Sequence, residues 1–100
     1  MAETITKVKE SLDTVILEPT KYKVVLYNDN STPVEFVIAL LMKIFRHAEA
    51  SAIDITLKVH NEGSGVAGIY SYEIAEQKGM EGTHMAREHG HPLVIKVEAE

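Results

Sequence analysis

Three observations predict an α+β or α/β fold in which a small sheet is covered by helices. Short runs rich in β-branched and aromatic residues lie near residues 22–27, 65–71 and 93–97, as is typical of strands. Between these runs, apolar residues recur at helical spacing. Strands interleaved with helical segments in the order β-α-α-β-α-β favour a two-layer sandwich.

The first strand is expected at residues 22–27, YKVVLY, and a helix follows after a polar segment. The sequence TPVE marks the helix start: Thr32 suits the N-cap, Pro33 the first helical position, and Glu35 completes a capping box. One face of this helix is expected to carry the apolar residues Val34, Val37, Ile38, Leu41 and Phe45.

A second helix is expected from about Glu49 to Val59, because Gly63 beyond it can take the left-handed conformation that ends helices. Its inward-facing residues are expected to be Ala52, Ile53, Ile55, Thr56 and Val59. The sequence GVAGIYS then predicts a strand, and a third helix is expected from about Tyr72 to His89. The final strand is expected to alternate Leu93, Ile95 and Val97 with Val94, Lys96 and Glu98.

Length and composition fit one domain. The chain has 100 residues, of which 45% are hydrophobic and 25% charged, and domains typically have about 100–150 residues. Residues 1–20 are expected to form a flexible extension, and residues 21–100 a core domain. The chain has no cysteine, no apolar signal sequence at its start and no apolar run of membrane-spanning length, so a cytoplasmic protein is expected.

Charge and motifs argue against several classes of protein. A net charge of −5 without clustered Lys and Arg disfavours nucleic-acid binding. No nucleophile elbow, phosphate loop or Cys–His pair is found, so neither an enzyme nor a cofactor is expected. His84, His89 and His91 lie close in sequence, but no carboxylate or cysteine completes a familiar spacing, so they are interpreted as solvated side chains rather than metal ligands.

A polar segment joins the first strand to the first helix and consists of Asn28, Asp29, Asn30, Ser31 and Thr32. A tight turn would need fewer residues. His60 is a second candidate, because it stands where an apolar helix runs out. From the residues alone, its imidazole can either cap helix carbonyls or serve a binding site.

Three motifs in the same order resemble the ClpS adaptor family. They are YKVVLYNDNSTPVEFV, LKVHNEGSGVAGIYSYEIAEQK and EHGHPL, and the resemblance covers residues 21–97. The spacing between Asn28 and His60 also agrees with the family pattern without insertion. That family delivers substrates with destabilising N-terminal residues, called N-degrons, to an AAA+ unfoldase of the ClpA or ClpC type.

The resemblance implies three antiparallel strands against three helices and no catalytic activity. It implies that the free α-amino group of the substrate is bound by Asn28, Asp29, Asn30 and His60. The first side chain of the substrate, from Leu, Phe, Tyr or Trp, is implied to enter a pocket. The counterparts of that pocket here are Leu26, Tyr27, Thr32, Val34, Val37, Thr56, Val59 and Leu93.

The chemistry of these residues supports an amine site independently. An α-ammonium group has three donors and a positive charge, so it needs convergent acceptors and a nearby anion. Asn28 and Asn30 offer side-chain carbonyl oxygens. Asp29 offers the negative charge, and a neutral His60 offers one ring nitrogen as an acceptor. An apolar pocket beside them would favour a large side chain by roughly 1.5–3 kcal/mol of burial.

The sequence departs from the family pattern at four positions. It has Asn30 where the family usually has Asp, Ser31 in place of an aromatic residue, and Val34 and Thr56 in place of Met. The missing acid at Asn30 predicts weaker attraction for the ammonium group. The short, β-branched Val34 predicts tolerance of Ile or Val as the first residue. The hydroxyl of Thr56 either favours Tyr or bonds back to a helix carbonyl, and the second is the simpler interpretation.

Glu73 and Lys78 match family positions that contact the N-terminal domain of the unfoldase, although such a pair is commonly only a solvated face. Two alternatives stand beside the adaptor hypothesis. One is a module of the same fold that binds and modulates the unfoldase without recognising peptides. The other is a small metal-binding protein that uses the late histidines.

Overall fold

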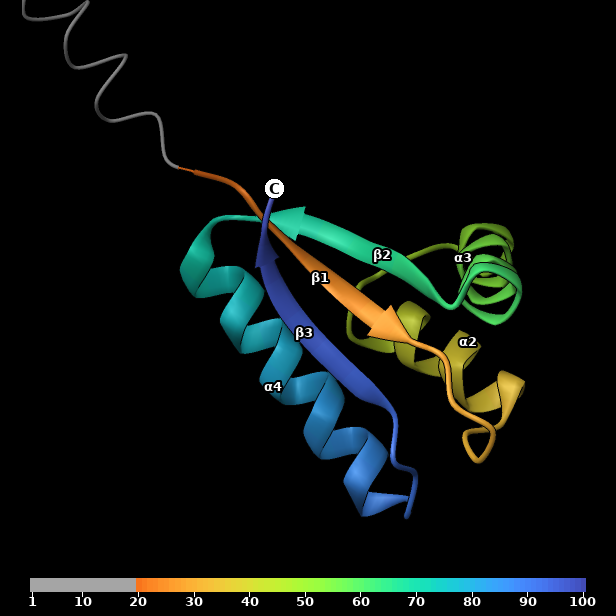
Figure 1. The fold of residues 1–100 in the computed structure, drawn as a ribbon. Coiled ribbons are helices and arrows are strands. Elements are labelled where there is room, and N and C mark those ends of the chain that lie inside the picture. Colours follow the sequence, from red (N-terminus) through yellow and green to blue (C-terminus); the bar gives the residue numbers. More distant parts are fainter. Residues whose placement is uncertain (1–19) are drawn as a thin grey trace, which may run out of the picture.

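The computed structural model describes residues 20–100 and consists of a three-stranded sheet with helices packed against it (Figure 1). In chain order the elements are β1 (Tyr22–Tyr27), α2 (Val34–Lys43), α3 (Glu49–Glu62), β2 (Ser64–Tyr70), α4 (Tyr72–Glu88) and β3 (Val94–Ala99). The predicted order β-α-α-β-α-β is confirmed. Of the expected extension, residues 1–19 lie outside the described part. Within residues 20–100, no helix combines the length and the apolar character that crossing a membrane requires.

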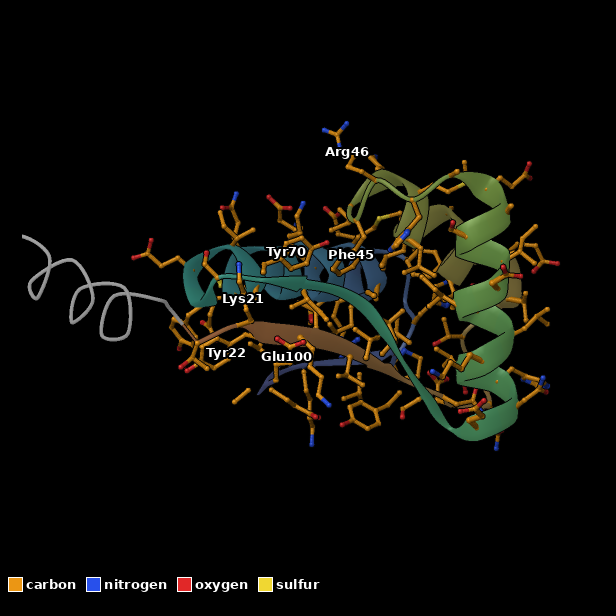
Figure 2. All side chains as sticks on the ribbon, turned by 90° about the horizontal axis from the view of Figure 1, so that it is seen from above. Lys21, Tyr22, Phe45, Arg46, Tyr70 and Glu100 are labelled. Atoms are coloured by element: carbon orange, nitrogen blue, oxygen red, sulfur yellow. The ribbon has the colours of Figure 1, made fainter. Side chains whose placement is uncertain are left out.

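The sheet is antiparallel, with β1 in the centre and the strand order β2-β1-β3. At one end of it the N–H of Glu100 donates to the carbonyl of Lys21 at 2.9 Å. Figure 2 shows Lys21, Tyr22 and Glu100 together at this end. The predicted two-layer α+β arrangement, with an antiparallel sheet covered by helices, is therefore confirmed.

One hydrophobic core joins the sheet to the helices. Its buried members are Val24, Leu26, Val37, Leu40, Leu41, Phe45, Ala52, Val59, Ala67, Ala75, Ala86 and Leu93. Helix α4 approaches the sheet closely because two glycines face it. A Cβ atom on Gly82 would lie 2.8 Å from Ile95 Cδ1, and one on Gly79 would lie 3.3 Å from Val97 Cγ2. These glycines therefore have a packing role, which offsets their low helix propensity.

The apolar faces of α2 and α3 differ in part from the predicted ones. Leu40 is fully buried although it was not predicted to face inward, whereas Val34 is 44% exposed and Ile53 is 37% exposed. Helix α3 also continues past Val59 to Glu62, and it ends where Gly63 takes a φ of 94°. The conformation predicted for Gly63 is thus confirmed.

The start of α2 corrects the predicted capping box. Pro33, not Thr32, is the N-cap residue, and no side chain caps the helix there. The carbonyl of Pro33 accepts hydrogen bonds from the N–H groups of Phe36 and Val37 at 3.1 and 3.2 Å. The hydroxyl of Thr32 donates to Asp29 instead. Since hydrogen bonds to a carboxylate are stronger than those between neutral groups, Thr32 belongs to the loop rather than to the helix.

Candidate functional site

A cavity of about 320 Å³ opens between the loop after β1, the first turns of α2 and the second half of α3. Figure 1 shows the end of β1 leading into this loop beside α2. The cavity is lined by Asn28, Asp29, Asn30, Thr32, Pro33, Val34, Val37, Thr56, Val59 and His60. It therefore joins polar residues from one loop to residues more than twenty positions away in the sequence.

The loop is organised by the carboxylate of Asp29. Its Oδ1 accepts hydrogen bonds from the backbone N–H groups of Ser31 at 2.7 Å and Thr32 at 2.8 Å. Its Oδ2 accepts a hydrogen bond from the Thr32 hydroxyl at 2.7 Å. Side chains of Asp commonly fold turns in this way. Asp29 therefore supplies both the shape of the loop and a negative charge at the cavity.

The ionised form of Asp29 is favoured in the folded protein. Burial raises the pKa of Asp29, but the Thr32 hydroxyl, the N–H groups of Ser31 and Thr32, and the nearby His91 lower it, and the pKa ends below its ordinary value. Hydrogen bonds donated to a carboxylate stabilise its charged form. The cavity therefore carries a full negative charge at neutral pH.

Asn28 and His60 are brought together by the end of α3. The N–H of Asn28 donates to the carbonyl of Gly63 at 2.9 Å, and the N–H of Gly63 donates to the carbonyl of Val59 at 2.9 Å. Because α3 runs to Glu62, His60 lies in its last turn. The exposed imidazole can thus offer a ring nitrogen to the same space as the amide side chains of Asn28 and Asn30.

The floor of the cavity is apolar. Val37 and Val59 are buried to 6% and 4% exposure, while Val34 stands at the mouth. Thr56 is 3% exposed, and its hydroxyl donates to the carbonyl of Ala52 at 2.7 Å. The hydroxyl therefore bonds back to its own helix, which is the simpler of the two interpretations, and the Thr56 methyl group is left to face the other apolar side chains.

Three residues of the predicted pocket do not line this cavity. Leu26 and Leu93 are 0% and 1% exposed and belong to the core. Tyr27 lines a different cavity, where its hydroxyl donates to Glu98, and this hydrogen bond is the main cause that raises the pKa of Tyr27. Since side chains of a strand alternate between its two faces, a residue next to buried Leu26 points the other way.

Pro33 also lines the cavity, although the sequence predicts only a helix-start role for it. It stands between Thr32 and Val34, which are both predicted pocket residues. Because Pro33 is the N-cap residue, its ring lies where the loop and the helix meet.

The two residues predicted to contact an unfoldase differ in their surroundings. Glu73 is exposed in the first turn of α4. Lys78 is partly buried, and its Nζ donates to the carbonyl of Ile44 at 2.9 Å while lying 5.6 Å from the centre of the Tyr70 ring. Lys78 therefore also ties α4 to the end of α2, a role that the sequence did not indicate.

The late histidines surround an aromatic ring. The rings of His89 and His91 lie 5.2 and 4.6 Å from that of Phe36. Within residues 20–100, no group of three His, Cys, Asp or Glu side chains has a metal-binding arrangement. A packing contact with Phe36 accounts for the proximity of these two histidines.

The fold and the cavity define a small α+β binding domain, in which a polar loop and an apolar floor meet. The family model of the ATP-dependent Clp protease adaptor protein ClpS matches residues 17–96. The ClpS adapter protein of Helicobacter hepaticus is 46% identical over 93 residues, which are 93% of this chain and 94% of that protein. The one of Shewanella piezotolerans is 43% identical over 96 residues, or 96% and 94% of the two chains.

A solved structure agrees with these relatives. Agrobacterium tumefaciens ClpS2 bound to L-phenylalaninamide superimposes with a TM-score of 0.81 at 38% sequence identity, and the match covers 83% of this chain and 100% of that one. The chain therefore belongs to the ClpS family of adaptor proteins of the ATP-dependent Clp protease.

Proposed function

We propose that the chain binds the free α-amino group and the bulky apolar first side chain of N-degron proteins in the cytoplasm. It then delivers them to a ClpA- or ClpC-type AAA+ unfoldase, and it acts by binding rather than by catalysis. One observation carries this proposal: the same cavity combines amine acceptors with an apolar floor.

The polar rim suits an ammonium group. Asn28, Asn30 and His60 offer neutral acceptors, and Asp29 offers a charge whose geometry is already fixed by the loop. Because both oxygens of Asp29 accept hydrogen bonds within the loop, Asp29 is expected to attract the ammonium group chiefly through its charge. The neutral acceptors are expected to form the shorter contacts.

The apolar floor suits one large side chain. The apolar surface of the cavity consists of Val34, Val37, Val59 and the Thr56 methyl group. None of these groups offers a free hydrogen-bond donor to a ligand. L-phenylalaninamide, the molecule bound by the Agrobacterium relative, carries a free amine next to a benzyl group. A site for such a molecule needs the two halves that this cavity combines.

Val34 is proposed to widen the range of accepted first residues. Its side chain is short and 44% exposed at the cavity mouth. A flexible Met at this position would fill the mouth, whereas Val leaves room beside the β-carbon of the ligand. Ile and Val are therefore expected to be accepted alongside Leu, Phe, Tyr and Trp.

Docking to the N-terminal domain of the unfoldase is proposed to involve Glu73 and Lys78 on α4. Glu73 is free of the core and suits a direct contact. Substitution of Lys78 would also remove its contacts with Ile44 and Tyr70. Glu73→Lys is thus the cleaner test, and it is expected to weaken pull-down of the unfoldase without weakening peptide binding.

The experiment that tests amine recognition is a titration with three peptides of otherwise equal sequence. One begins with Leu and a free amine, one carries the same Leu acetylated, and one begins with Ile. We expect the free Leu peptide to bind and the acetylated peptide to fail, because acetylation removes the charge and two of the three donors. His60→Ala should weaken binding, whereas Asn61→Ala on the exposed neighbour is the matched control.

The outcomes separate the candidate functions. Equal binding of free and acetylated peptides would contradict amine recognition. Failure of both, together with retained binding of the unfoldase, would favour the module that modulates the unfoldase without binding peptides. In that case Asn30→Asp is the next variant to measure, because it restores a second acid to the cavity.

A further inference from the structure

The strand β3 forms an edge of the sheet. Among residues 20–100 it pairs with β1 alone. Each edge strand has a helix packed against it, α4 against β3 and α3 against β2, and on the β2 side the His47 ring also hydrogen-bonds to the carbonyl of Ala67. Figure 1 shows α4 running alongside β3 and α3 near the start of β2. The backbone groups of an edge strand that has no second strand beside it are a template for pairing with another strand.

The backbone groups that β3 presents outward can be assigned. The N–H of Glu100 donates to the carbonyl of Lys21 of the chain leading into β1. In an antiparallel pair, alternate residues direct both backbone groups to the same neighbour. Lys96 and Glu98 therefore bond to β1, whereas Ile95, Val97 and Ala99 direct their N–H and C=O groups away from the sheet.

An apolar groove of about 510 Å³ runs beside this edge, between α4 and β3. Its lining residues are Glu76, Gly79, Met80, Thr83, His84, Arg87, Ile95 and Val97. Met80 is 68% exposed, which is high for a large apolar side chain. The groove is distinct from the candidate amine site, and no residue lines both.

The sequence of β3 is complementary to itself. In an antiparallel two-fold pair centred on Val97, Ile95 of one copy lies opposite Ala99 of the other, and the outward backbone groups of these residues face each other. In the same register Lys96 lies opposite Glu98 of the second copy, and this contact occurs twice. A register centred on Lys96 would instead place two lysines together, and one centred on Glu98 would place two glutamates together, which is unfavourable.

We propose that β3 pairs with β3 of a second copy of this chain, in the register centred on Val97. The two sheets then form one continuous antiparallel sheet. Met80 and the groove beside it come to lie along the new seam, which removes exposed apolar surface from water. Each pair carries two amine cavities, so the proposed dimer is a two-site form of the adaptor.

Sedimentation of the full chain from micromolar to millimolar concentration tests the pairing. We expect a monomer–dimer equilibrium. Lys96→Glu should weaken the dimer by at least about tenfold, because both cross-strand charge pairs become repulsive. The double variant Lys96→Glu/Glu98→Lys should restore it. Lys58→Glu makes the same charge change on the exposed face of α3 and is the matched control.

Cysteine pairing tests the register, since the chain has no cysteine of its own. Lys96→Cys and Glu98→Cys are made as separate proteins and then oxidised alone and as an equal mixture. We expect the mixture to give mainly the mixed disulfide dimer, because residues 96 and 98 lie opposite each other in a close, non-hydrogen-bonded pair. In that dimer the second Lys96–Glu98 pair is still intact.

Two results would overturn the proposal. One is a chain that stays monomeric at millimolar concentration, which would leave the β3 edge to a different partner. The other is a dimer that resists Lys96→Glu and gives a statistical mixture of disulfides, since that dimer would use another surface. If a charge variant unfolds, as judged by circular dichroism, the cysteine mixture still decides the register.

Discussion

Asp29 carries the negative charge of the cavity, yet its two oxygens already accept three hydrogen bonds from Ser31 and Thr32. The loop can therefore hold its shape before a ligand arrives, and an ammonium group meets a charge that does not have to be positioned. Preorganisation of this kind reduces the entropic cost of binding. Within the five-residue polar segment, Asp29 fixes the loop conformation by accepting hydrogen bonds from Ser31 and Thr32.

Replacement of Asp29 by Asn should lower stability in a pH-dependent way. The variant loses the charge, and its amide nitrogen cannot accept the Thr32 hydroxyl. The folded-state pKa of Asp29 is below its ordinary value. The ionised carboxylate therefore contributes its full stabilisation above about pH 4, the pKa of Asp in the unfolded chain, and this stabilisation is lost as the pH falls through the folded-state pKa. Urea unfolding should show that wild type and variant differ in their free energy of unfolding at pH 7 and that this difference becomes smaller in acid.

A matched control separates this loop effect from the loss of any carboxylate. Asp54 is exposed on α3, away from the hydrogen bonds of the loop. Asp54→Asn is expected to show a smaller stability change at pH 7 than Asp29→Asn. If the loss in free energy of unfolding caused by Asp29→Asn grew in acid, the stabilising role assigned to the Asp29 carboxylate would be contradicted.

Thr56 is the residue whose environment predicts a negative result. Its hydroxyl already donates to the carbonyl of Ala52, so it has no donor left for a ligand. Thr56→Val should therefore change the ratio of affinities for Tyr- and Phe-starting peptides by less than about twofold. A large loss confined to the Tyr peptide would show that the hydroxyl leaves its helix to bind the ligand.

At the scale of elements, the C-terminus of α3 connects two parts of the site. Gly63 has a φ of 94°, and its carbonyl accepts the N–H of Asn28 while its own N–H bonds to Val59. A Cβ atom here would have no close neighbour, so backbone conformation alone disfavours a side chain. Gly63→Ala should reduce the free energy of unfolding by about 1–2 kcal/mol.

The control for Gly63→Ala is Gly63→Asn. Asn tolerates the left-handed conformation better than Ala does, so urea unfolding should show a smaller loss for Asn. Peptide affinity should fall more for Gly63→Ala than for Gly63→Asn, because the turn at Gly63 positions Asn28 next to His60. Equal losses for Ala and Asn would contradict a conformational cause.

Elements could be predicted from the sequence where local chemistry decides them. The bounds of β1 matched because its strand-forming residues act locally, and Gly63 ends α3 because its left-handed conformation is also a local property. The capping box at Thr32 failed because Asp29 competes for the same hydroxyl. A pattern of residue types does not reveal which of two possible partners a side chain will choose.

At the scale of the whole molecule, the cavity depends on contacts between distant segments. The spacing of apolar residues did not reveal that Leu40 is buried, because Leu40 meets α4, where a Cβ on Gly82 would lie 3.7 Å from it. Leu26 and Leu93, which the resemblance assigned to the pocket, are buried in the core and do not line the cavity, because packing between distant segments decides which side chains reach it. The family resemblance supplied the pairing of the loop with His60, which no local pattern contains.

Leu40 and Val34 lie on one helix and should separate folding from binding. Leu40 is fully buried in the core shared by the sheet and the helices, whereas Val34 is 44% exposed at the cavity. Leu40→Ala should lower the free energy of unfolding by about 2–5 kcal/mol, in one transition that fluorescence and circular dichroism report together. Val34→Ala should stay within about 0.5 kcal/mol of wild type and instead change the ratio of Ile- to Leu-peptide affinities. If Leu40→Ala gave two separate transitions, the core would not be one cooperative unit. If Val34→Ala destabilised the fold and left that ratio unchanged, Val34 would be a packing residue and the mouth of the cavity would lie elsewhere.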